Sequence, residues 1–400
     1  MNPQLDRRML LGRAAGLAGL SLTSSFPFDL RPERKDSKPG TLVLLQLTGG
    51  NDGLSTVIPW ADDIYAAARR STRFTQEEVL ALDDYLGLNA ELGFMRDEYE
   101  AGRLGIVQGA GYPNPNRSHF KSMDIWHSAS PSGRAVNSGW IGRLSEALSD
   151  GGYNPEGIVH IGGSLPYSLY SSSSPAVSFV QPDNYRWIGN EPEISSIADR
   201  VEPKAGTGAV GHLRSVMRDA AASSRRIQAA AGDYETTVKY PGSSLARSLR
   251  SAAALIKSEL GCRVISVQQT GYDTHQGQRS AHSRQMAELD AALRAFHADL
   301  AGTEAGRRTV SLAFSEFGRR VIENGSGGTD HGTAGPMFLL GPGVRGGLHG
   351  EHPSLTERDG DDLIFTTDFR SVYATVIEDL FGVGSERVLG APYEKLPLLA

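Results

Sequence analysis

Carboxylate and imidazole side chains follow several apolar segments of the chain at points where a strand would end. Asp52, preceded by Asn51, comes after the apolar run 41–47. Further candidates stand in Gly-Tyr-Asp-Thr-His, in Thr-Asp-His-Gly-Thr and after a glycine-rich turn: Asp273, His275, Asp330, His331 and His349. One Asp-Gly or Asp-His pair is more often a turn or a surface feature, so the prediction rests on four strand ends together. This ligand set suits zinc, manganese or another borderline divalent ion, and two such ions can clamp an in-line displacement.

Two further segments add polar groups that could act on an anionic ester. Ser118 is a candidate nucleophile because a hydroxyl beside a metal ion is readily deprotonated, and Arg117 is a candidate clamp for the anion. His119 is a candidate ligand or proton carrier. Alternatively, Ser118 caps the helix expected to follow it. Glu316 and Arg319, after the run 309–314, are either a metal ligand and a substrate clamp or a structural ion pair.

The elements that must position these residues alternate between strands and helices. Continuous apolar runs predict buried strands at 41–47, 104–108, 157–161, 264–267, 309–314 and 337–340. Apolar residues at helical spacing predict helices over 245–260, 286–300 and 372–380. We therefore expect an α/β fold with a mostly parallel central sheet and helices on both faces. Ligands of such sheets bind beyond the carboxyl ends of the strands, where the candidate residues lie. His282 and His297 are expected on a helix surface.

The composition is that of an ordinary globular protein, with 39% hydrophobic and 22% charged residues. The net charge of −6 argues against a nucleic-acid partner, which normally selects a basic face. The single cysteine, Cys262, excludes an internal disulfide and is expected to be a small buried residue.

The first 30 residues carry a twin-arginine pair, Arg7 and Arg8, followed by a short apolar stretch. We interpret 1–30 as a twin-arginine signal segment, which predicts the export machinery as a partner and a periplasmic or extracellular location. The stretch is too short and too rich in Gly and Ala for a membrane span, and no stable span is expected in the mature chain. Residues 31–40 are interpreted as a linker and 41–400 as one domain, with an insertion or cap at 167–242.

Several motifs together resemble the family called domain of unknown function 1501, from about residue 40 to the end of the chain. They are Leu-Thr-Gly-Gly-Asn-Asp-Gly-Leu at 47–54, Asn-Arg-Ser-His-Phe at 116–120, Met-Asp-Ile-Trp at 123–126, Gly-Tyr-Asp-Thr-His at 271–275, Phe-Ser-Glu-Phe-Gly-Arg at 314–319, Asp-His-Gly-Thr-Ala at 330–334 and Thr-Asp-Phe-Arg at 367–370. The resemblance implies an alkaline phosphatase/sulfatase-like fold and metal-dependent hydrolysis.

The resemblance also implies roles for particular residues. Asp52 would be the metal ligand after the first strand, Ser118 the nucleophile, and Asp330 with His331 the Asp-His ligand pair. Asp273 and His275 approximate a further ligand pair but stand closer together in the chain than the Asp-x-x-x-His pair of the superfamily pattern. The last ligand would be His349 or, less favoured, His352. The residues before Ser118 do not follow the order seen in sulfatases, which slightly favours phosphate.

Three functions stay open at this stage. The first is an exported hydrolase that uses one or two divalent ions on a small anionic ester or a sulfated or phosphorylated glycan. The second is a non-catalytic binding or assembly protein that keeps the fold. The third is a calcium-dependent glycan-binding protein with oxygen ligands only.

Overall fold

The computed structural model of the chain describes residues 40–130, 136–149, 152–185 and 209–400. The signal segment and all but the last residue of the linker lie outside these ranges, so both stay predictions. Across the described ranges, no helix combines the length and apolarity that crossing a membrane requires.

The described residues build a nine-stranded central sheet that contains every strand expected from the apolar runs. The order across the sheet is β13 (Gly347–His349), β5 (Leu104–Gly111), β12 (Gly335–Leu340), β9 (Thr309–Phe314), β1 (Thr41–Thr48), β8 (Val264–Thr270), β6 (Ile158–Ile161) and β7 (Val177–Phe179). The short strand β16 (Thr367–Asp368) also pairs with β5. The six expected strands are therefore confirmed.

One strand of the sheet runs against the others. β12 is antiparallel to both of its neighbours, β5 and β9, whereas the remaining pairs are parallel. The mostly parallel sheet is therefore confirmed. Because β12 is reversed, its amino end lies at the same edge of the sheet as the carboxyl ends of β1, β5, β8 and β9.

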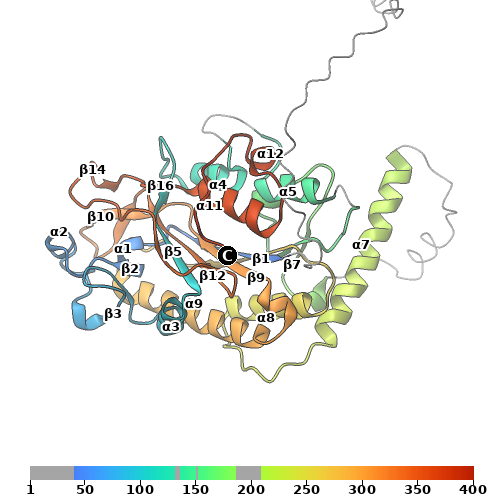
Figure 1. Cartoon of the computed structure of the whole chain (residues 1–400), viewed down its shortest axis with the longest axis horizontal. Helices are drawn as coiled ribbons and strands as arrows, with labels where there is room; N and C mark the ends of the chain where they lie inside the picture. The colour runs from blue at the N-terminus through green and yellow to red at the C-terminus, as the bar shows by residue number, and fades with distance from the viewer. Residues whose placement is uncertain (1–39, 131–135, 150–151, 186–208) are drawn as a thin grey trace, which may run out of the picture. The chain divides into compact units, whose positions relative to one another are not determined.

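Helices cover both faces of the sheet, as expected (Figure 1). Alternate residues of β1 point to opposite sides. Val43 and Leu45 belong to a core with α8 (Ser244–Lys257), α9 (Gln278–Leu300) and α3 (Gly93–Glu100). Leu42 and Leu44 belong to a second core with α4 (His119–Ser128), α5 (Trp140–Leu148) and α11 (Phe369–Thr375). Because β1 is buried on both sides, its sequence is continuously apolar rather than alternating.

The remaining elements are short or lie outside the central sheet and the helices that cover its two faces. The helices are α1 (Gly53–Thr56), α2 (Asp63–Ala68), α7 (Ala209–Gly232), α10 (Glu304–Arg307), α12 (Ser385–Leu389) and a π-helical turn, η5 (Val376–Leu380), which extends α11. Small sheets are formed by β10 (Arg319–Glu323) with β11 (Thr329–His331), by β14 (Arg358–Asp359) with β15 (Asp362–Leu363), and by β2 (Val57–Ile58), β4 (Gly87–Asn89) and β3 (Val79–Ala81).

The segment 167–242, expected as an insertion or cap, supplies both sheet and helix. β7 pairs with β6 at the end of the central sheet, and α7 packs against α8. Residues 186–208 of this segment lie outside the described part of the chain, so the cap stays a prediction.

A buried ion pair holds the turn that follows β1. The carboxylate of Asp52 accepts from the Leu54 N–H (3.2 Å) and the Ser55 hydroxyl (2.7 Å), and it pairs with the buried guanidinium of Arg69. Arg69 also donates to the Val321 carbonyl (3.0 Å). Burial opposes ionisation of Asp52, but the Arg69 charge outweighs it and lowers the pKa of this carboxyl. The pair therefore joins the end of β1 to β10.

Asp52→Asn is expected to lower the free energy of unfolding by about 3–5 kcal/mol, because it leaves the Arg69 charge buried without a partner. Since the pKa of Asp52 is lower in the folded chain, the wild-type advantage is present at neutral pH and shrinks as pH falls below about 4. Urea unfolding at several pH values measures both effects. The exposed Asp63→Asn serves as control, and an equal, small loss in both variants would contradict the expectation.

Candidate functional site

The candidate site lies at the edge of the sheet where the carboxyl ends of β1, β5, β8 and β9 meet. The reversed β12 brings its amino end to the same edge, and the β10–β11 hairpin stands directly before it in the chain. The hairpin register places Arg319 opposite His331. Residues from five separate segments can therefore meet here.

The buried side chain of Arg319 ties these segments together. Its Nε, Nη1 and Nη2 atoms donate to backbone carbonyls of the loops after β1 and β8 and of β11: Gly49, Gly50 (2.9 Å), Tyr272 (2.9 Å) and Thr329 (2.9 Å). Nη2 also donates to Oδ1 of Asp273 at 2.8 Å. Arg319 is therefore a structural clamp on the protein itself, and its bond to Asp273 reaches into the site. These contacts give Arg319 a structural role, but its carboxylate partner is Asp273 and not Glu316, the partner expected for a structural ion pair.

Two glycines after β1 allow this close approach. Gly49 has φ +121°, and a Cβ there would lie 2.5 Å from the Asp273 backbone nitrogen. Gly50 has φ +82°, and a Cβ there would lie 2.3 Å from the Phe317 ring. An L side chain at either position would meet both backbone strain and a clash.

Three side chains form a cluster whose geometry could hold a metal ion. One ligand atom from each of His119, Asp273 and His331 lies within 4.8 Å of the other two. His331 Nε2 is 3.0 Å from Asp273 Oδ1, and His119 Nε2 is 3.6 Å from Asp273 Oδ2. We call these three residues the His–Asp cluster.

The hydrogen bonds behind the His–Asp cluster orient both imidazole rings. His331 Nδ1 lies 2.9 Å from the Arg117 carbonyl, and His119 Nδ1 lies 2.9 Å from Oε1 of the buried Glu316. Carbonyl and carboxylate oxygens accept, so both Nδ1 atoms donate and each neutral ring presents the lone pair of Nε2. Both lone pairs face the Asp273 carboxylate, another acceptor. A cation or a proton must therefore lie between them, and the donor set fits a divalent ion.

His275 and Asp330 extend the cluster on one side. His275 Nε2 lies 3.0 Å from both His331 Nε2 and Asp273 Oδ1. Its Nδ1 is 3.3 Å from Asp330 Oδ1, which also accepts from Asn324 Nδ2 at 3.2 Å. Asp330 is thus placed to orient the His275 ring and is not one of the three residues of the His–Asp cluster.

The charges of the site shift the pKa values of its members. Burial opposes ionisation of Asp273, but the hydrogen bond and the charge of Arg319 outweigh it and lower the pKa of Asp273 to about 2. The hydrogen bond to Glu316 raises the pKa of His119. The Asn324 hydrogen bond lowers the pKa of Asp330. Asp273 is therefore an anion at any physiological pH, as a metal ligand must be.

Three residues expected at the metal site have other surroundings. Asp52 is engaged by Arg69, as described above. The buried Asn51 accepts from the Thr56 hydroxyl at 3.0 Å through Oδ1. His349 lies on β13, and its Nε2 is 2.8 Å from the Arg345 carbonyl. No described contact joins any of the three to the His–Asp cluster.

Ser118 lies between the two residues that connect its loop to the cluster. The Arg117 carbonyl bonds His331, and His119 is a cluster member. Ser118 occupies the N-cap position of α4, but its exposed hydroxyl makes no capping hydrogen bond. The Arg117 guanidinium lies 3.2 Å from the Asp362 carboxylate. Ser118 is thus an exposed residue that precedes a cluster residue in the chain, while the Arg117 guanidinium already has an anionic partner.

Sequence patterns missed two residues that shape the site. The Phe317 ring lies against the rings of His119 (4.9 Å between centroids) and His331 (4.7 Å). Asn324 bonds Asp330 and the His275 carbonyl. Phe317 stands inside a motif already quoted and could have been noticed there. Asn324 has no such signal.

His282 and His297 do not lie on the helix surface as expected. His282 is fully buried with Nε2 3.0 Å from the Thr56 hydroxyl, and burial lowers its pKa to about 4. His297 is partly buried, and its ring lies 6.0 Å from that of Phe94 on α3. The expectation was wrong because the helical pattern marks one apolar face, whereas α9 is covered on more than one side.

Fold and site together define an α/β protein with a His–Asp cluster at the carboxyl edge of a mostly parallel sheet. The family model described as a protein of unknown function, DUF1501, matches residues 106–390, so the chain belongs to this family. The expected family is thereby confirmed. No curated protein matches the chain.

Solved structures similar to the chain include a protein of the alkaline phosphatase superfamily and a putative sulfatase. A superfamily protein from Vibrio parahaemolyticus has a TM-score of 0.43 and 8% identity, covering 89% of this chain and 69% of that one. A putative sulfatase from Bacteroides thetaiotaomicron has a TM-score of 0.39 and 12% identity, covering 90% and 76%. Ps i-CgsB, solved with k-i-k-neocarrahexaose, has a TM-score of 0.42 and 12% identity, covering 90% and 75%.

His331→Ala is expected to abolish metal binding, because it removes the nitrogen that faces both Asp273 and His275. Plasma mass spectrometry of protein loaded with zinc or manganese and then desalted measures the bound ion. His349→Ala is the matched control, since His349 is a histidine outside the cluster, and it should retain the wild-type amount. Equal metal content in wild type and His331→Ala would show that the ion, if any, binds elsewhere.

Glu316→Gln is expected to weaken metal binding by about 10–100-fold, the usual effect of removing a carboxylate that orients a histidine ligand. Competition with a chromogenic chelator measures the affinity. Glu378→Gln is a suitable control, because Glu378 lies outside the cluster and accepts from the Ser385 N–H (3.3 Å), as Glu316 accepts from the Gly49 N–H (2.9 Å). Unchanged affinity in Glu316→Gln would mean that His119 is not a ligand.

Proposed function

We propose that the chain is a metal-dependent hydrolase of phosphate- or sulfate-type esters. The observation that supports this most directly is the pair of Nε2 lone pairs, from His119 and His331, that face the ionised Asp273. Such an arrangement is costly unless a proton or a cation lies there, and the convergence of one ligand atom from each residue to within 4.8 Å of the others favours a metal ion. A divalent ion bound by these residues, with His275 beside them, would polarise an ester oxygen and neutralise developing negative charge.

The chain's own groups supply the remaining requirements of ester hydrolysis. We assign Ser118 as the nucleophile, because its hydroxyl is exposed, makes no capping bond and stands next to a cluster residue. The N–H groups at the start of the ten-residue helix α4 favour an anion at this position. Arg117 can contribute to anion binding only by exchanging its Asp362 partner for the substrate.

The substrate class follows from the charge of these groups. A cluster of cation and imidazole at a helix N-terminus selects an anionic ester, and a sulfated or phosphorylated glycan is one such substrate. The twin-arginine segment predicts that this activity is exported to the periplasm or outside the cell, which cell fractionation would show.

Ser118→Ala is expected to reduce turnover of p-nitrophenyl phosphate, bis-p-nitrophenyl phosphate or p-nitrophenyl sulfate by about 10²-fold or more, while the metal content stays at the wild-type level. Steady-state rates of the zinc-, manganese- and calcium-loaded protein measure this. The control is Ser280→Ala, at an exposed serine on α9. Turnover that survives Ser118→Ala would exclude Ser118 as nucleophile. Bound metal without turnover of any ester would favour a binding protein instead.

A further inference from the structure

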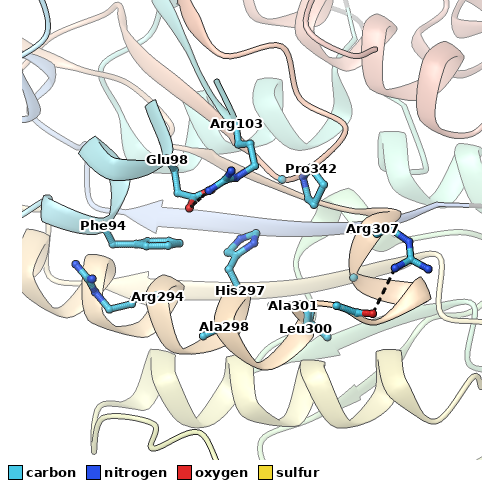
Figure 2. Close-up of a pocket in the computed structure, with 13 residues that line it drawn as sticks. Phe94, Glu98, Arg103, Arg294, His297, Ala298, Leu300, Ala301, Arg307 and Pro342 are labelled. Carbon is cyan, nitrogen blue, oxygen red and sulfur yellow. Dashed lines mark hydrogen bonds and ion pairs between the residues drawn. The ribbon is translucent and has the colours of Figure 1, made fainter. Parts of the chain in front are cut away.

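A groove of about 460 Å³ lies at the opposite edge of the sheet from the His–Asp cluster. It is lined by residues that precede β5 and β9 and follow β12, together with side chains of α3 and α9 (Figure 2). Its volume is within the range of small-molecule sites. None of the residues assigned to ester hydrolysis lines it.

The floor of the groove is apolar and bears two rings. Phe94 and His297 lie 6.0 Å apart between ring centroids, with Leu300 and Pro342 further along the groove. His297 Nε2 is 3.2 Å from the Ser311 hydroxyl, and within the described residues Nδ1 makes no hydrogen bond. Burial lowers the pKa of His297 to about 4, so this ring is neutral at physiological pH. The floor therefore suits an uncharged, flat or aliphatic body.

The rim of the groove is positively charged. Three guanidinium groups and one carboxylate line it. Arg103 is neutralised by Glu98 through two hydrogen bonds of 2.7 Å. Arg294 lies 3.4 Å from the Asp290 carboxylate.

The third guanidinium, that of Arg307, differs from the other two in its partners. It is exposed, it donates only to the Gly302 carbonyl (3.3 Å), and no carboxylate of the described residues pairs with it. Figure 2 shows it at the end of the groove beyond His297 and Pro342. An anionic group at this end of the groove would pair with the Arg307 guanidinium, for which the described residues supply no carboxylate.

We propose that this groove binds a small amphipathic anion, with a planar or aliphatic body on the Phe94–His297 floor and one carboxylate, sulfonate or phosphate group at Arg307. The site is separate from ester hydrolysis, because the groove and the His–Asp cluster lie at opposite edges of the sheet. The positive charge of Arg307 favours an anionic group on the ligand, and the apolar floor favours an apolar remainder.

The probe for this site is 8-anilinonaphthalene-1-sulfonate, a flat apolar anion whose fluorescence rises on binding. Titration of the full, metal-loaded chain should show one saturable site. Arg307→Gln should weaken binding about tenfold or more, the effect of losing one charge-assisted hydrogen bond. Ala298→Trp, at an exposed position of the lining, should fill the groove and abolish binding.

Controls separate the groove from other sources of binding. Arg247→Gln is matched to Arg307→Gln, because Arg247 is also exposed and donates to a backbone carbonyl, that of Gly242; it should bind as the wild type does. His331→Ala should also bind normally, which excludes the metal site. The uncharged analogue N-phenyl-1-naphthylamine should bind equally to wild type and Arg307→Gln. Circular dichroism and thermal melts ensure that no variant binds the dye through unfolding.

The proposal is overturned if Arg307→Gln and Ala298→Trp, both folded, bind the sulfonate as tightly as the wild type. It is also overturned if Arg247→Gln loses as much affinity as Arg307→Gln, since the effect would then reflect net charge alone. Loss in His331→Ala would assign the probe to the metal site.

Discussion

The site depends on one buried guanidinium, that of Arg319. Its donors engage carbonyls in the loops after β1 and β8 and in β11, and one of them reaches Asp273. A planar fork with five donors can satisfy acceptors in several directions at once, which a lysine cannot do. Most partners of Arg319 are neutral carbonyl groups, so its positive charge is not neutralised by them and stabilises the ionised form of Asp273. The same side chain thus fixes where the strand ends stand and keeps the central carboxylate ionised.

Glu316 makes a second connection, between the start of α4 and the sheet. Its Oε1 accepts from the Gly49 N–H (2.9 Å) and from His119. The end of β9 thereby holds the start of α4 against the end of β1. With the Arg117 carbonyl behind His331, both imidazoles are oriented from their far side, and no cluster ring depends on solvent for its direction. Arrangements of this kind are typical of metal-binding histidines.

The sequence predicted most of the fold and about half of the site. Strands buried on both faces leave long apolar runs, and the segments between those runs contain His119, Asp273, His275 and His331, which the structure brings together. The partner of Asp52 could not be predicted, because Arg69 lies 17 residues away on an irregular segment. The direction of β12 was equally hidden, since an apolar run is the same in either direction. His349 was misplaced because it lies within a strand at the sheet edge, and not beyond a strand end.

The separation of the cluster residues along the chain determines when the site can exist. Asp273 and His331 are 58 residues apart, and His119 is 197 residues from the Glu316 that orients it. No short segment therefore contains a binding site, and the ligands meet only when the central strands have paired. Contacts of such long range form slowly, because the intervening chain must close into a loop first. The identity of the bound ion would then be determined by the metal ions available in the compartment where the chain folds. For a chain carried across a membrane in the folded state, as a twin-arginine leader predicts, that choice falls to the metal pool of the cytoplasm rather than to the compartment where the protein works.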